Sequence, residues 1–221
     1  FFAGHSLGEY SALSCAGYIK FSDTIKILKI RGEAMQNAVP KGVGGMVAVL
    51  GSTIKNIENI LKDNKNNLNL EIANDNSEGQ IVVSGKLSDL EKFCVVLKSL
   101  GIKNIKLPVS APFHCILMNN ATKIIENEIK KIDLSKGFNT LMSNVTADKI
   151  NQTTQIKDLL IKQIESRVRW REIVINMINN GVNNFIEIGP GKVLSGLIKR
   201  INKEVKVQSI NSEEDINNLI I

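Results

Sequence analysis

Apolar positions along the chain follow two spacings, and their alternation predicts an α/β fold. Short apolar runs typical of strands are separated by longer segments in which apolar residues repeat at helical spacing. Strands that alternate with helices favour a mostly parallel sheet. In the two outer parts of the chain we predict strands at 1–3, 138–143, 185–188 and 205–210, and helices at 7–16, 23–37, 115–131, 158–164, 170–178 and 193–201.

The central part of the chain has a compact pattern of its own. Strands are predicted at 46–50, 68–73, 81–83 and 102–107, helices at 53–61 and 88–100, and a turn at 74–79. This β-α-β-β-α-β order is that of a ferredoxin-like unit. We therefore predict two parts: a larger α/β part from residues 1–43 and 110–221, and a ferredoxin-like subdomain inserted at 44–109.

Composition and charge exclude several classes of protein. The chain has 221 residues, 43% hydrophobic and 23% charged, with a formal net charge of +6. The positive charge is spread along the chain and forms no stripe of the kind that binds nucleic acid. No apolar run reaches the length of a membrane span. Three distant cysteines and two histidines predict neither a disulfide framework nor a zinc site.

The identity of the first residue and the frequencies of Asn, Lys and Ile carry information about the source of the sequence. Phe1 is not Met and lies inside a predicted strand, so we expect a segment to precede it. Asn, Lys and Ile are overused, which is typical of AT-rich coding sequences. Localisation stays open between a plastid, including an apicoplast, and a bacterial-type cytoplasm.

A nucleophile motif follows the first predicted strand. Gly4-His5-Ser6-Leu7-Gly8 has the G-x-S-x-G pattern in its required context of strand, sharp turn and helix, as in hydrolase-like parallel sheets. Ser6 is the predicted nucleophile. The Leu7 N–H at the helix N-terminus is placed to donate to a developing oxyanion.

A serine nucleophile needs a base, and the chain has two histidines. His5 adjoins Ser6 within the turn, so we expect its side chain to point away from the reacting face. His114 is predicted at the start of a helix, where the helix N-terminus lowers a histidine pKa and keeps the ring neutral. His114 is therefore the predicted base. Carboxylates that could complete a hydrolase triad, Asp75 and Asp89, lie in the central unit and are poor candidates.

Four motifs together resemble the malonyl-CoA:acyl carrier protein transacylase family. They are GHSLGEYSAL at 4–13, RGEAMQ at 31–36, FHC at 113–115 and EIGPGKVL at 187–194. The resemblance covers the whole chain in order. It implies that Ser6 forms a malonyl ester, that His114 is base and acid, and that Arg31 pairs with the malonyl carboxylate.

The same resemblance assigns roles to two further residues. The backbone carbonyl of Gln163 is expected to orient the histidine in place of a carboxylate. Phe113 is expected to crowd branched acyl groups and so to favour malonyl. Arg31 also has a reason of its own, since a guanidinium fork binds a carboxylate in a way that Lys cannot copy.

The implied function is transfer of malonyl from malonyl-CoA to the phosphopantetheine thiol of acyl carrier protein. No metal or redox cofactor is expected, and malonyl-CoA is a substrate. The expected partners exclude nucleic acid and membrane, and a monomer is expected. The alternatives are a serine hydrolase of the esterase class, an acyltransferase domain of a polyketide synthase, and a non-catalytic module that binds the carrier protein.

Overall fold

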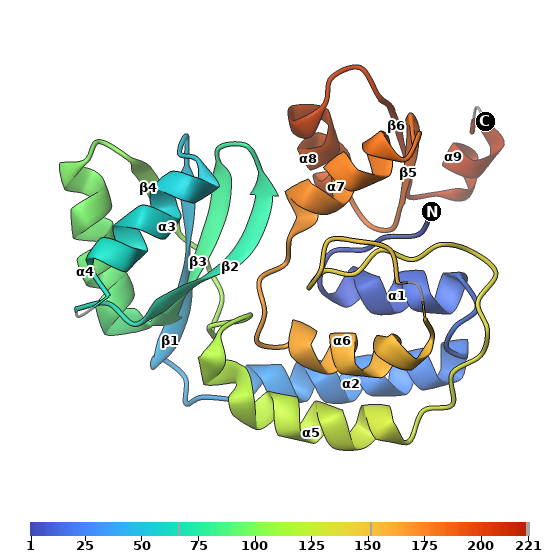
Figure 1. The fold of residues 1–221 in the computed structure, drawn as a ribbon, viewed down its shortest axis with the longest axis horizontal. Coiled ribbons are helices and arrows are strands. Elements are labelled where there is room, and N and C mark those ends of the chain that lie inside the picture. The colour runs from blue at the N-terminus through green and yellow to red at the C-terminus, as the bar shows by residue number, and fades with distance from the viewer. Residues whose placement is uncertain (66, 151, 220–221) are drawn as a thin grey trace.

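The computed structural model has a mixed α/β fold and describes residues 1–65, 67–150 and 152–219 (Figure 1). Its strands are β1 Gly44–Leu50, β2 Leu70–Ser77, β3 Gln80–Lys86, β4 Lys103–Lys106, β5 Asn184–Ile188 and β6 Lys206–Ile210. Its helices are α1 Leu7–Cys15, α2 Phe21–Gln36, α3 Ile54–Asp63, α4 Leu87–Ser99, α5 Asn119–Lys130, α6 Thr154–Gln163, α7 Trp170–Asn179, α8 Val193–Ile201 and α9 Glu213–Asn217.

The central part of the chain forms an antiparallel sheet with strand order β2-β3-β1-β4. Because side chains alternate across a strand, Val47 and Val49 of β1 face one side, where they pack with Ile57 of α3 and Phe93 of α4. The opposite face carries smaller apolar residues and lies against the rest of the molecule, where Phe113 packs on it. The two helices therefore cover only the outer face of this sheet (Figure 1).

The larger part packs its helices around two apolar cores. One core joins α1, α2, α5 and α6, and the other joins α7 and α8 to β5. β5 and β6 are parallel, and a single parallel bridge joins Phe2 to Leu141. Among the described residues, this strand pair and this bridge are what forms of the larger parallel sheet that the sequence predicts.

Several predicted boundaries are wrong, each for a local reason. α2 begins at Phe21 with Lys20 as its N-cap, two residues before the start predicted at 23. The helix predicted from 115 starts as a 3-10 turn, Ile116–Met118, before α5. β2 extends to Ser77, into the predicted turn, because its pairing with β3 continues as far as Ser77 opposite Gln80. α9 was not predicted.

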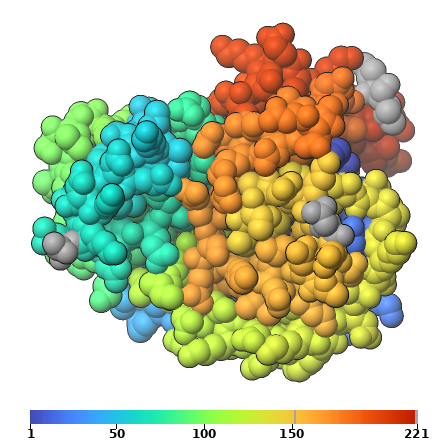
Figure 2. All heavy atoms as spheres, in the orientation of Figure 1, coloured from blue at the N-terminus to red at the C-terminus, as the bar shows by residue number. Residues whose placement is uncertain are grey.

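An ion pair joins the small sheet to the larger part. Arg171 of α7 donates to both carboxylate oxygens of Asp75 on β2, with Nη2 to Oδ2 at 2.8 Å. In the space-filling view the cyan and green atoms of the small sheet and its helices lie directly against the orange segment that leads into α7 (Figure 2). None of the helices in the described part of the chain has the length and apolar character needed to cross a bilayer.

Candidate active site

Ser6 occupies a strained turn immediately before α1. Its backbone has φ 53° and ψ −104°, a conformation that residues with a side chain rarely adopt. Two hydrogen bonds fix the turn, Gly8 N–H to the His5 carbonyl at 2.9 Å and Ser6 N–H to Asn144 Oδ1 at 2.8 Å. The turn carries the Ser6 hydroxyl toward His114, as the motif predicts.

His114 lies within hydrogen-bond reach of the Ser6 hydroxyl. Its Nε2 is 2.8 Å from Ser6 Oγ, and its Nδ1 is 2.9 Å from the Gln163 carbonyl oxygen. A carbonyl oxygen only accepts, so Nδ1 carries the proton and Nε2 is free to accept from the serine. The Gln163 carbonyl therefore holds the ring in the tautomer that a general base needs.

The direction predicted for the His114 pKa agrees with the structure, but the predicted cause is wrong. His114 is in a turn with φ 59°, ahead of the 3-10 segment, and not at a helix N-terminus. Burial comes first, and the positive charge of Arg31 second, among the causes that lower its pKa to about 3. The ring is therefore neutral at physiological pH.

Arg31 reaches the same hydroxyl from α2. Its Nη2 donates to Ser6 Oγ at 2.9 Å and to the side-chain oxygen of Gln163 at 3.0 Å. Arg31 is 5% exposed, and its guanidinium lies over the Tyr10 ring. Its Nε has no hydrogen-bond partner among the described residues. This buried cation is placed beside whatever acyl group Ser6 would carry.

Two buried residues that the sequence analysis missed support the site. Asn144 accepts from Ser6 N–H and donates through Nδ2 to the Gly4 carbonyl at 2.8 Å, so it spans the turn. Glu9, on the first turn of α1, accepts from Gln163 Nε2 at 2.6 Å and from Asn144 N–H at 3.3 Å. Asn144 lies 138 residues from Ser6, and no local pattern marks it.

Comparison with known proteins identifies the family. The family model described as acyl transferase domain matches residues 1–219. The malonyl CoA-acyl carrier protein transacylase of Bacillus subtilis is 41% identical over 98% of this chain and 69% of its own length. The chain belongs to the acyl transferase domain family.

Solved structures of related proteins agree with this membership. The malonyl CoA-acyl carrier protein transacylase of Clostridium perfringens matches with a TM-score of 0.94 at 44% identity, over 98% of this chain and 68% of that one. A malonyl-transacylase in complex with a type II polyketide acyl-carrier protein matches with a TM-score of 0.93 at 35% identity, over 98% and 70%.

The remaining predicted residues of this acyl transferase domain lie around the same turn. Leu7 is the first residue of α1, so its N–H has no acceptor within the helix. Phe113 precedes His114 and packs between two apolar clusters. The His5 ring donates from Nε2 to Asn76 Oδ1 at 2.8 Å and lies beside Trp170, so it contacts β2 and not Ser6.

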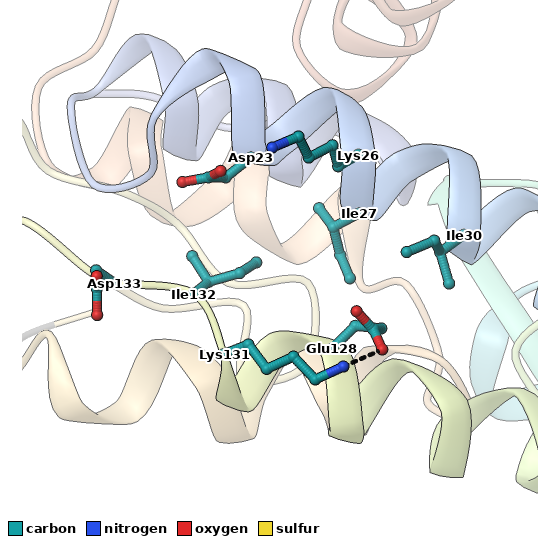
Figure 3. Close-up of a pocket in the computed structure, with 8 residues that line it drawn as sticks. All are labelled: Asp23, Lys26, Ile27, Ile30, Glu128, Lys131, Ile132 and Asp133. Carbon is teal, nitrogen blue, oxygen red and sulfur yellow. Dashed lines mark hydrogen bonds and ion pairs between the residues drawn. The ribbon is translucent and has the colours of Figure 1, made fainter.

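A surface hollow of the acyl transferase domain lies apart from this chemistry. It measures about 300 Å³ and opens between α2 and α5 (Figure 3). Its lining is Asp23, Lys26, Ile27, Ile30, Glu128, Lys131, Ile132 and Asp133. Lys131 and Glu128 pair with each other across its edge at 2.6 Å. Because it contains neither the serine nor the histidine, we do not assign the reaction to it.

Proposed function

We propose that the protein transfers malonyl from malonyl-CoA to the phosphopantetheine thiol of acyl carrier protein, and so supplies fatty-acid elongation. The observation that carries the proposal is the hydrogen-bonded chain from Ser6 Oγ through His114 to the Gln163 carbonyl, with Arg31 on the same serine oxygen. A nucleophile, an oriented base and a buried cation are the groups that transfer of a carboxylated acyl group requires.

The first half of the reaction forms an ester. Ser6 Oγ attacks the thioester carbonyl carbon while His114 Nε2 takes the hydroxyl proton. The tetrahedral oxyanion is stabilised by the Leu7 N–H. The carbon–sulfur bond then breaks, and His114 returns its proton to the departing CoA sulfur. Malonyl remains on Ser6 as an ester, and CoA leaves as a free thiol.

The second half repeats these steps in reverse with a new thiol. His114 takes the proton of the phosphopantetheine thiol, whose sulfur attacks the Ser6 ester. Collapse of the intermediate breaks the bond to Ser6 Oγ, which regains its proton from His114. Every proton is carried by protein groups, so we propose no cofactor.

Specificity is assigned to two side chains. Arg31 donates to the malonyl carboxylate. The carboxylate loses its hydration shell and gains a charge-assisted hydrogen bond from a side chain that is held in place. Phe113 crowds any branch on the acyl chain. The net charge of +6 suits the phosphates of CoA and an acidic carrier protein. We propose a monomer that binds neither nucleic acid nor membrane.

The architecture is part of the proposal. We propose that residues 44–109 are an inserted ferredoxin-like subdomain, supported by the antiparallel order β2-β3-β1-β4. We propose that residues 1–43 and 110–221 belong to a hydrolase-like part with a parallel sheet. The parallel pairing of β5 with β6 and the bridge from Phe2 to Leu141 support that assignment.

The test follows the fate of the acyl group. The protein is incubated with malonyl-CoA, with and without carrier protein bearing phosphopantetheine, and the products are separated by mass. We expect malonyl-carrier to form and little free malonate. Malonate as the main product in the presence of the carrier would instead make the protein a hydrolase. Ser6→Ala is the control for transfer that does not use the site.

A further inference from the structure

Glu9, which directly follows the nucleophile motif, has no part in the reaction as described. Glu9 is fully buried, and its Oε2 accepts from Gln163 Nε2 at 2.6 Å. Its Oε1 has no hydrogen-bond partner among the described residues. A buried carboxylate is costly unless an opposite charge compensates for it. The positive charge that compensates for Glu9 must therefore be found among its neighbours.

The nearest buried cation is Arg31, and an amide separates the two. Arg31 Nη2 donates to the oxygen of the Gln163 side chain at 3.0 Å, and the nitrogen of the same amide donates to Glu9. In the described part of the chain the two charged groups do not form an ion pair with each other. Arg31 therefore keeps unused donors, although a counter-charge lies one amide away.

We infer that Glu9 is the internal counter-ion of Arg31 and that it sets how strongly the site holds a carboxylated acyl group. This inference rests on the proposed function, since it needs Arg31 to bind the acyl carboxylate. Glu9 balances the buried guanidinium while the site is empty. When a substrate carboxylate arrives, the two anions share one cation and repel each other through a poorly solvated interior.

The charge of Glu9 changes near neutral pH. Burial raises its pKa to about 7, while the positive charge of Arg31 acts in the opposite sense. Three titratable groups around it keep one state between pH 6 and 8: Arg31 stays charged, Tyr10 has a pKa of about 12 and His114 has a pKa of about 3. Burial lowers the pKa of His5, which favours its neutral ring. Protonation of Glu9 therefore removes the repulsion as the pH falls.

The test compares acyl groups with and without a carboxylate. We measure kcat/KM for Ser6 acylation by malonyl-CoA and by acetyl-CoA. Glu9→Gln preserves an acceptor oxygen for the Gln163 amide but removes the charge. It should raise kcat/KM for malonyl-CoA about 3- to 10-fold more than kcat/KM for acetyl-CoA at pH 8. Glu33→Gln, an exposed change on α2, is the matched control and should alter neither.

The pH dependence of the wild-type protein provides a second, independent test of the inference. Its malonyl-to-acetyl ratio of kcat/KM should rise 3- to 10-fold from pH 8 to pH 6, with a midpoint near 7, since the malonyl carboxylate stays ionised there. If Glu9→Gln does not fold, the pH profile of the wild-type protein alone tests the inference. A flat wild-type ratio, or equal changes for both acyl groups in Glu9→Gln, would overturn the inference. Absence of any malonyl ester on wild-type Ser6 would refute the proposed function instead.

Discussion

At the scale of single residues, the site combines a strained serine with a histidine whose pKa is far from ordinary. The conformation of Ser6 costs roughly 1–3 kcal/mol in comparable cases and is held by Asn144 and by the start of α1. His114 is buried beside Arg31, and both effects disfavour the protonated ring. The low pKa leaves a neutral imidazole facing Ser6 Oγ, as the proposed role of general base requires.

The pKa of His114 predicts how acylation depends on pH. The base works only when neutral, and a pKa of about 3 keeps it neutral throughout the range from pH 5 to 8. We expect the rate of Ser6 acylation by acetyl-CoA to vary less than about twofold over that range. A histidine with the ordinary pKa of about 6.5 would instead lose about 30-fold at pH 5. The rate is measured by stopped-flow detection of the released CoA. A fall in this rate with a midpoint near pH 6.5 would contradict a pKa of about 3 for His114.

Arg31 predicts a difference between acyl groups. Arg31→Ala removes the cation that lies 2.9 Å from Ser6 Oγ. We expect kcat/KM for malonyl-CoA to fall by about 2–4 kcal/mol in transition-state binding, or roughly 30- to 1,000-fold, and acetyl-CoA to lose much less. Competition assays with both thioesters measure the ratio. Equal losses would show that the carboxylate is bound elsewhere.

At the scale of elements, the two glycines of the motif have unequal roles. A Cβ on Gly4 would lie 2.0 Å from the backbone C and O of Gly8, so the turn can pack on α1 only without it. A Cβ on Gly8 would meet nothing within 4 Å. The sequence motif treats the two positions alike, but only Gly4 is required by close packing.

This difference predicts the outcome of a matched pair of substitutions. Gly4→Ala should destabilise the protein by about 3 kcal/mol or more, because the overlap is with backbone that cannot rotate away. Gly8→Ala should fold as well as the wild type or better, since Ala is favoured over Gly in a helix by about 1 kcal/mol. Urea unfolding measures both. Similar losses for the two variants would contradict the packing argument.

The elements also show what the sequence could predict and what it could not. Ser6 follows from a local motif, and His114 from the small number of histidines. Arg31 and Gln163 needed the resemblance to a family, because nothing in α2 or α6 indicates that their side chains meet. Asn144 and Glu9 were missed, since their roles depend on contacts between segments more than 130 residues apart. The start of α2 at Phe21 was missed because the ends of helices are defined only to within one or two residues.

At the scale of the whole molecule, the small sheet is attached near the site that it borders. Asp75 pairs with Arg171, and the next residue of β2, Asn76, accepts from His5 in the nucleophile turn. A backbone bond from Asp75 N–H to the Val168 carbonyl lies between them. The end of β2 thus connects the two parts of the chain at the turn that carries Ser6.

The ion pair of this junction predicts a loss of stability. Arg171→Ala leaves Asp75, 1% exposed, as a buried carboxylate without its partner. We expect a loss of about 2–4 kcal/mol, below the range for fully buried pairs because Arg171 is partly exposed. Arg167→Ala breaks a pair with the half-exposed Glu58 and should cost less than about 1 kcal/mol. Thermal unfolding of both variants checks this, and equal losses would contradict it.

The most direct measurement locates the acyl group on the chain. The protein is incubated with malonyl-CoA, quenched in acid and digested, and the peptides are mapped by mass spectrometry. We expect one malonyl group on the peptide that contains Ser6, none in Ser6→Ala, and formation slowed about 100-fold or more in His114→Ala. A malonyl group on Cys115 or another side chain, with Ser6 unmodified, would contradict the account of the site.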